Sequence, residues 1–216
     1  MNETLNDIIR EYIDFVNRQI GVYMDALAGF AGHHVNVERQ VHIENRAVGI
    51  KINEKGERIV VCVRYEDPTK PDVILNRIIR ASDYLAVNAK DGSNAQQHSQ
   101  AVVVFLFSFW EEEIRPRIAA SKQVELKQIT SDIMGDLRIL RHAVLHAKGM
   151  LRADKHKSLK VLNNMFAVDQ PIHIPYENMH KIFELIKQDC ARILGISNPE
   201  TIKDIGIQRQ GPITTC

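Results

Sequence analysis

Two arginines and two histidines fall within nine residues of one another, in the sequence Arg138-Ile-Leu-Arg141-His142-Ala-Val-Leu-His146. Histidine accepts and donates protons near neutral pH, and the guanidinium fork of arginine binds phosphate oxygens. Metal-free RNA cleavage needs these groups: one to take the proton of a ribose 2′-OH, one to protonate the 5′-oxygen, and a cation for the phosphate. The segment is therefore a candidate site for RNA cleavage.

A metal site is the alternative use of the same histidines. His142 and His146 are four residues apart and share a helix face, as in zinc proteases, but no Glu follows His142 and no acidic third ligand is near. We therefore expect no metal and no other cofactor. Distant histidines stay open as alternative ligands: His33, His34, His42 and His173.

The spacing of Arg141 and His146 sets a geometric condition. Five residues on a straight helix turn two side chains roughly 140° apart. A compact site therefore requires either that the helix end near His146 or that a second chain contribute its own arginine and histidine.

The charge is uneven along the chain. The whole protein carries 28 Lys and Arg against 27 Asp and Glu, a net charge of +1, yet residues 138–160 hold seven basic residues and one acidic residue, a net charge of +6. A basic segment in an otherwise acidic chain favours a polyanion partner. The predicted RNA contacts are Arg138, Lys148, Arg152, Lys155 and Lys157. The alternatives are a solvated helix end, whose last turn favours cations, and for Arg138 an ion pair with Asp132.

These residues resemble a known motif. Arg141, four intervening residues and His146, followed by Ala-Lys-Gly, are similar to the R-x(4–6)-H motif of the HEPN superfamily, with the polar His142 directly after the arginine. The apolar helix that ends in Phe-Ser-Phe-Trp-Glu at 107–111 and the turn and helix after Phe166 resemble the flanks of that fold. The resemblance covers roughly residues 95–194.

The resemblance implies a helical bundle that forms a homodimer with a composite active site, and a metal-independent endoribonuclease that leaves a 2′,3′-cyclic phosphate. By position, His146 is the acid or base, Arg141 holds the scissile phosphate and His142 assists. Relatives serve as toxins with a cognate antitoxin or in phage defence. Others lack catalysis, so a dimerisation or binding module for a partner protein or nucleotide is the alternative function.

The hydrophobic pattern predicts the elements that carry the site. Helices are expected at residues 5–27, ended by Gly29 and Gly32, at 73–87, at 95–120 with a kink or early stop caused by Pro116, and at 124–148, ended by Gly149. A hairpin is expected at 47–52 and 58–65, and shorter helices at 155–166 and 176–194. We predict a mostly α fold, an HEPN-like bundle of four to five helices in one domain of residues 1–195, with a β-hairpin insertion at about 34–66 and a tail at 196–216.

Composition limits the class of protein. The 216 residues are 44% hydrophobic and 25% charged, typical of a globular domain. Cys62, Cys190 and Cys216 form no paired pattern, which indicates a reducing compartment. The most apolar stretch, residues 101–110, is too short to span a membrane. We therefore expect a cytoplasmic protein without a membrane partner.

Overall fold

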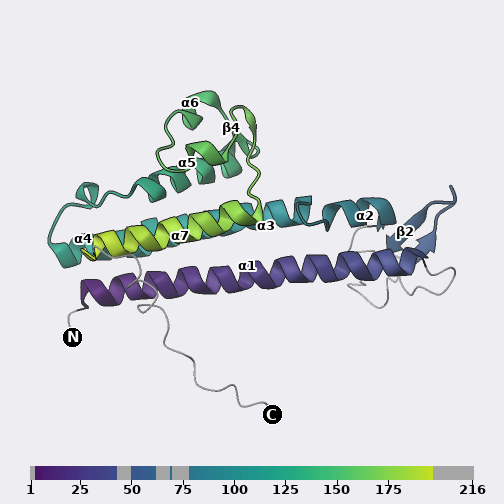
Figure 1. Ribbon diagram of the computed structural model, residues 1–216, viewed down its shortest axis with the longest axis horizontal. Helices are drawn as coiled ribbons and strands as arrows, with labels where there is room; N and C mark the ends of the chain where they lie inside the picture. Colours follow the sequence, from purple (N-terminus) through teal and green to yellow (C-terminus); the bar gives the residue numbers. More distant parts are fainter. Residues whose placement is uncertain (1–2, 43–49, 62–68, 70–77, 197–216) are drawn as a thin grey trace, which may run out of the picture. The chain divides into compact units, whose positions relative to one another are not determined.

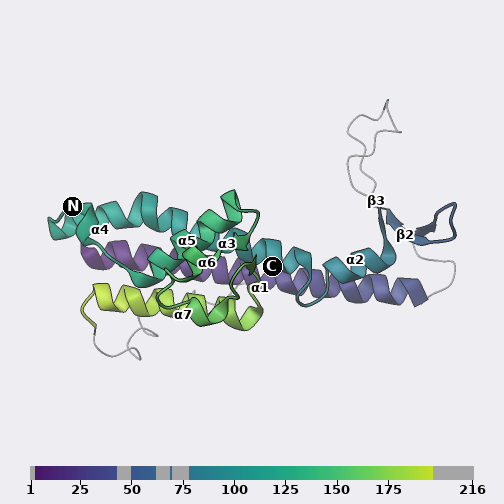
Figure 2. The same ribbon diagram turned by 90° about the horizontal axis from the view of Figure 1, so that it is seen from above.

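The computed structural model describes residues 3–42, 50–61, 69 and 78–196, and this part of the chain is mostly helical (Figure 1 and Figure 2). The predicted mostly α class is confirmed. The helices are α1 (Leu5–His42), α2 (Ala81–Val87), α3 (Ser93–Phe109), the π-helical η1 (Trp110–Ile114), α4 (Arg115–Lys122), the 3₁₀ turn η2 (Leu126–Gln128), α5 (Asp132–His146), α6 (Ala153–His156), the 3₁₀ turn η3 (Asn163–Met165) and α7 (Tyr176–Ile193). The strands are β1 (Ile50–Ile52), β2 (Arg58–Val61), β3 (Ile78–Arg80), β4 (Met150–Leu151) and β5 (Gln170–Pro171).

The chain divides into two compact units. The first comprises residues up to Tyr23 together with those from Ser99 onward, and the second comprises Met24–His98. Helices α1 and α3 each contribute residues to both units. The expected hairpin insertion at about 34–66 falls within the second unit, and the expected tail at 196–216 lies outside the described residues from 197 onward.

The core of the first unit joins α1, α3, α5 and α7. The buried Tyr12 of α1 donates a hydrogen bond to the Leu106 carbonyl of α3 at 3.1 Å, and its ring lies 5.4 Å from that of Trp110. On the inner face of α5, the side chains of Leu137 and Leu140 are fully buried. Burial of each large apolar side chain stabilises the fold by about 1.5–3 kcal/mol, so this core fixes α5 in place.

Helix α1 is longer than the pattern predicts. We expected Gly29 and Gly32 to end it, and this is wrong because α1 continues to His42. A glycine inside a helix costs only about 1 kcal/mol relative to alanine, which does not stop a helix that gains contacts further on. Val37, beyond both glycines, is buried against Ala81 in the second unit.

The predicted hairpin is present in the second unit as far as the structure describes it, and residues 47–49 and 62–65 of the prediction lie outside the described part. Strands β1 and β2 pair antiparallel with Ile52 opposite Arg58, and the turn uses Gly56 at φ +77°. Strand β3 pairs antiparallel with β2 and adds a third strand. The helix expected at 73–87 is therefore wrong at 78–80, where β-branched Ile78 and Ile79 extend the sheet, and α2 begins only at Ala81. Residues 73–77 lie outside the described part.

We expected a kink or an early stop at Pro116, and the structure shows instead a change of helix type before it. Helix α3 passes into the π-helical turn η1 before α4 begins at Arg115, with Pro116 in its first turn. Proline lacks an N–H and clashes with the carbonyl four residues earlier, which is Glu112, so the regular ladder cannot continue through this turn. The wider turn places Trp110 and Glu111 at the end of α3.

Helix α5 starts later than predicted. We expected a helix from residue 124, but α5 begins at Asp132, because Ser131 caps it by accepting a hydrogen bond from the Met134 N–H at 3.1 Å. The predicted stop at Gly149 is confirmed: Gly149 has φ +77° and its N–H bonds to the Ala143 carbonyl at 2.9 Å. The helix predicted at 155–166 is wrong, since only α6 and η3 form there, while that at 176–194 is confirmed as α7.

Candidate functional site

The two predicted catalytic histidines lie side by side. His142 and His146 occupy successive turns at the C-terminal end of α5, both exposed, with ring centroids 5.0 Å apart and planes at 51°. Helix α5 ends at His146, which meets the first of the two conditions that the spacing imposed. Two imidazoles this close and open to solvent can exchange protons with the same ligand.

The structure does not place Arg141 beside these rings. Its guanidinium carbon lies 5.8 Å from the centre of the Phe107 ring of α3, a cation–π contact between the two helices. The Nε atom is buried without a hydrogen-bond partner. An unpaired buried donor costs about 1–3 kcal/mol, and this N–H is closed to solvent in the described structure.

Arg138 lies one turn before His142 on the same helix and is exposed. No ion pair or hydrogen bond of its guanidinium occurs among the residues that the structure describes. The alternative pair with Asp132 is not formed, because Asp132 accepts a hydrogen bond from Lys160 at 2.6 Å instead. Since α-helices rise 1.5 Å per residue, Arg138, His142 and His146 follow one another at about 6 Å along the axis.

The other predicted RNA contacts come after α5. Lys148 is exposed at φ +53° in the turn that ends the helix, and Arg152 and Lys157 are exposed at the two ends of α6. Lys155 has an exposed ion pair with Asp154 at 3.7 Å. Figure 1 shows β4 and α6 next to α5, and the segment that contains these cations follows α5 directly in the chain.

Asp136 is a key residue that the sequence analysis missed. Only 1% exposed, its carboxylate accepts hydrogen bonds from the backbone N–H groups of Lys160, Val161 and Leu162 at 2.8–3.1 Å. This holds the segment after α6 against α5 and explains why no regular helix continues there. The sequence does contain a signal for this residue, because the helical spacing of the apolar residues places acidic Asp136 next to Leu137 on the side of α5 that is predicted to be buried.

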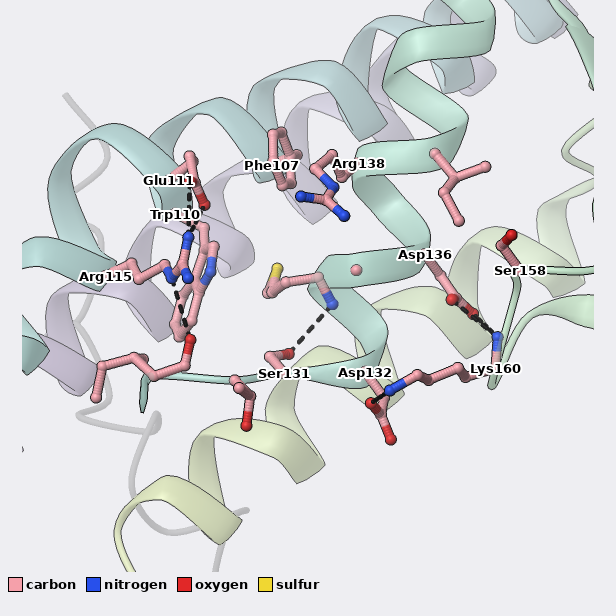
Figure 3. A pocket seen from close by; sticks show the side chains of 15 residues that line it. Phe107, Trp110, Glu111, Arg115, Ser131, Asp132, Asp136, Arg138, Ser158 and Lys160 are labelled. Carbon is pink, nitrogen blue, oxygen red and sulfur yellow. Dashed lines mark hydrogen bonds and ion pairs between the residues drawn. The ribbon is translucent and has the colours of Figure 1, made fainter. Parts of the chain in front are cut away.

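A pocket of about 310 Å³ lies between the end of α3, η1 and the first half of α5 (Figure 3). Arg138 extends from α5 toward Phe107 at its edge, and Gly135 and Ser131 line it from the same helix and its cap. One wall is the segment that contains Lys160. A second pocket, of about 380 Å³, lies between α5 and α7 and includes the Asp189–Arg192 ion pair.

The acidic groups at the first pocket are all bound by the protein itself. Arg115 donates two hydrogen bonds to Glu111 at 2.8 and 3.0 Å. The hydrogen bond with Asp132 raises the pKa of the Lys160 ammonium, and Asp136 is bound by backbone amides. Within the described ranges, no group of three or more His, Cys, Asp or Glu side chains is arranged to hold a metal ion. Nor does any described helix combine the length and apolarity needed to cross a bilayer.

No family model, curated protein or solved structure matches this chain.

Proposed function

We propose that the end of α5 is the active site of a metal-independent endoribonuclease. The observation that carries the proposal is the exposed pair of His142 and His146, with ring centroids 5.0 Å apart. Metal-free phosphodiester cleavage needs a base and an acid at one phosphate, and neighbouring imidazoles supply both. The net charge of +6 in residues 138–160 favours an RNA substrate at this place.

In the proposed reaction, the ribose 2′-oxygen attacks the adjacent phosphorus while one histidine accepts the 2′-OH proton. The new 2′-oxygen–phosphorus bond forms as the bond from phosphorus to the 5′-oxygen breaks. The other histidine donates a proton to the departing 5′-oxygen, and exchange with water restores both rings. We assign His146 as acid or base and His142 as its partner, and the products are a 2′,3′-cyclic phosphate and a 5′-hydroxyl.

The phosphate charge requires a cation. Arg141 is the proposed ligand from its position in the motif, and its guanidinium has to leave Phe107 to reach the phosphate, because its Nε is buried there. A homodimer with a composite site would supply a second arginine to each pair of histidines. We also propose a cytoplasmic location and a role as a toxin or phage-defence nuclease, with a cognate antitoxin as partner.

The second candidate function is a non-catalytic module that binds a partner protein or nucleotide. The position of Arg141 favours it, since an arginine held against Phe107 contributes to packing between α3 and α5 without any catalytic demand. The two functions differ in one measurable property, which is turnover of RNA.

The test compares wild type, His142→Ala and His146→Ala with the control His33→Ala, in which another exposed histidine, on α1, is removed. Each protein is incubated with total RNA in EDTA, and fragments and their end groups are analysed. We expect cyclic-phosphate ends, a rate about 10²–10⁴-fold lower for the two α5 variants, and an unchanged rate for the control. Absence of cleavage by folded wild type, or equal cleavage by all four proteins, would contradict the proposal.

A further inference from the structure

The pocket beside Arg138 is built from rigid parts. On one side, Arg115 binds Glu111 and also donates to the carbonyls of Leu126 and Ile129 at 3.2 and 3.1 Å, which fixes the segment before α5. On the other side, the hydrogen bonds to Asp136 fix the wall that includes Lys160. The π-helical turn η1 contributes to the lining, and such turns are frequent at functional sites.

Three acidic and three basic side chains line this pocket, and one of the cations forms no ion pair among the described residues. Glu111 forms an ion pair with Arg115 and Asp132 with Lys160, while the Asp136 carboxylate keeps its charge and accepts hydrogen bonds from three backbone amides. Arg138 alone among the charged lining residues has no partner within the described chain, and its side chain reaches the pocket edge (Figure 3). The Ser131 hydroxyl, which accepts from the Met134 amide, keeps its own proton for donation. These donors suit an anion with several oxygens.

A glycine lies at the wall of the pocket. Gly135 lies in the first turn of α5 and lines the pocket, and a Cβ atom added there would meet nothing within 4 Å. Glycine is among the poorest helix formers, and the open space at this position would also accept a larger side chain. The pocket volume of about 310 Å³ is at the small end of the range of ligand sites, about 300–1,000 Å³, and suits one nucleotide-sized anion.

We propose that this pocket binds a nucleotide phosphate through Arg138, and that the phosphate belongs to the RNA nucleotide next to the one being cleaved. The inference rests on the proposed function, because the pocket lies one helical turn from His142. That turn is about 6 Å along the axis, the same order as the separation of consecutive phosphates in a single strand. A free mononucleotide is the other source of the same chemistry.

Two variants test the pocket by different routes. Arg138→Gln removes the cation and keeps the side-chain length, while Gly135→Leu fills the space and leaves every charge in place. Arg18→Gln, which removes another exposed arginine on α1, is the matched control. Circular dichroism and thermal unfolding establish that each variant is folded.

Binding is measured with a short 2′-O-methyl RNA, which cannot form the cyclic phosphate, and with 5′-AMP. We expect both pocket variants to bind the RNA about tenfold more weakly. For Arg138→Gln, we expect the slope of log affinity against log salt concentration to decrease by an amount that corresponds to about one phosphate contact. With cleavable RNA, the expected change is a higher KM with kcat retained. RNA affinity equal to that of wild type in both variants would overturn the proposal, and binding of 5′-AMP alone would overturn the assignment to RNA.

The outcomes separate this inference from the proposed function. Wild type that cleaves RNA with kinetic constants unchanged in both pocket variants would refute the pocket and leave the ribonuclease intact. Wild type that never cleaves RNA, but binds the 2′-O-methyl RNA through Arg138 and Gly135, would refute the ribonuclease and leave the pocket intact.

Discussion

Replacement of Asp136 by alanine tests whether one buried carboxylate holds the segment after α6. The variant leaves the amides of Lys160, Val161 and Leu162 without their acceptor. Lys160 and Val161 are exposed and their amides can bind water, whereas Leu162 is buried and its amide would stay unpaired. At about 1–3 kcal/mol for the buried amide and less for the other two, we expect a loss of about 3 kcal/mol of unfolding free energy.

For a chain of this size, a loss of about 3 kcal/mol lowers the melting temperature by roughly 6–12 °C. Asp136→Asn keeps one oxygen acceptor but not the charge, so we expect a smaller loss of about 1–2 kcal/mol. The control is Asp132→Asn on the same helix, whose exposed pair with Lys160 is worth about 0–1 kcal/mol. Urea unfolding followed by circular dichroism measures all three.

The reasoning would be refuted by an Asp136→Ala protein within about 1 kcal/mol of wild type, or by equal losses for the asparagine variants of Asp136 and Asp132. Either result would mean that the contacts of Leu159 and Leu162, rather than the carboxylate, hold the segment in place. Amide hydrogen exchange at residues 160–162 provides a local measurement, with faster exchange expected in Asp136→Ala.

Two further predictions concern stability. Burial raises the pKa of Tyr12 well above its ordinary value, so its contribution to stability is complete below the unfolded pKa of about 10 and is lost as pH rises through the folded pKa. We expect alkaline unfolding monitored at the tyrosinate absorption band to be less steep in pH for Tyr12→Phe, and an unchanged slope would contradict this assignment. Gly149→Ala places a side chain at φ +77° and should cost about 1–2 kcal/mol, whereas Gly21→Ala, in open space on α1, should stabilise by about 0.5–1 kcal/mol. Thermal unfolding measures whether each variant is destabilised or stabilised as expected. A stabilised Gly149→Ala protein would be inconsistent with the left-handed turn after α5.

Local pattern was sufficient for elements whose apolar residues repeat at helical or strand spacing. The start of α1, the hairpin around Gly56 and helix α7 were predicted within a few residues for this reason. The far end of α1 was not, because it depends on the contact of Val37 with Ala81, which lies more than forty residues away in sequence. The contact of Val37 with Ala81 outweighs the low helix propensity of Gly29.

The candidate site also has features that local sequence spacing predicts and features that depend on tertiary contacts. The pairing of His142 with His146 follows from a spacing of four residues on one helix, and periodicity alone predicts it. The position of Arg141 depends on Phe107 in another helix, and the pocket depends on the π-helical turn and on the amides that bind Asp136. No local pattern encodes such tertiary contacts, so the sequence predicts the pairing of the two histidines but not their surroundings.

Helix α5 joins the two proposed binding places into one rigid unit. Its inner face is buried through Leu137 and Leu140, its start is capped by Ser131, and its end is set by the turn at Gly149. Arg138 and His146 are therefore separated by helix geometry, about 12 Å along the axis, and not by loop conformation. Sites on rigid elements hold their groups more accurately than sites on loops. A strand bound at Arg138 would thus reach the histidines in a defined register, which is what selective cleavage of one phosphodiester requires.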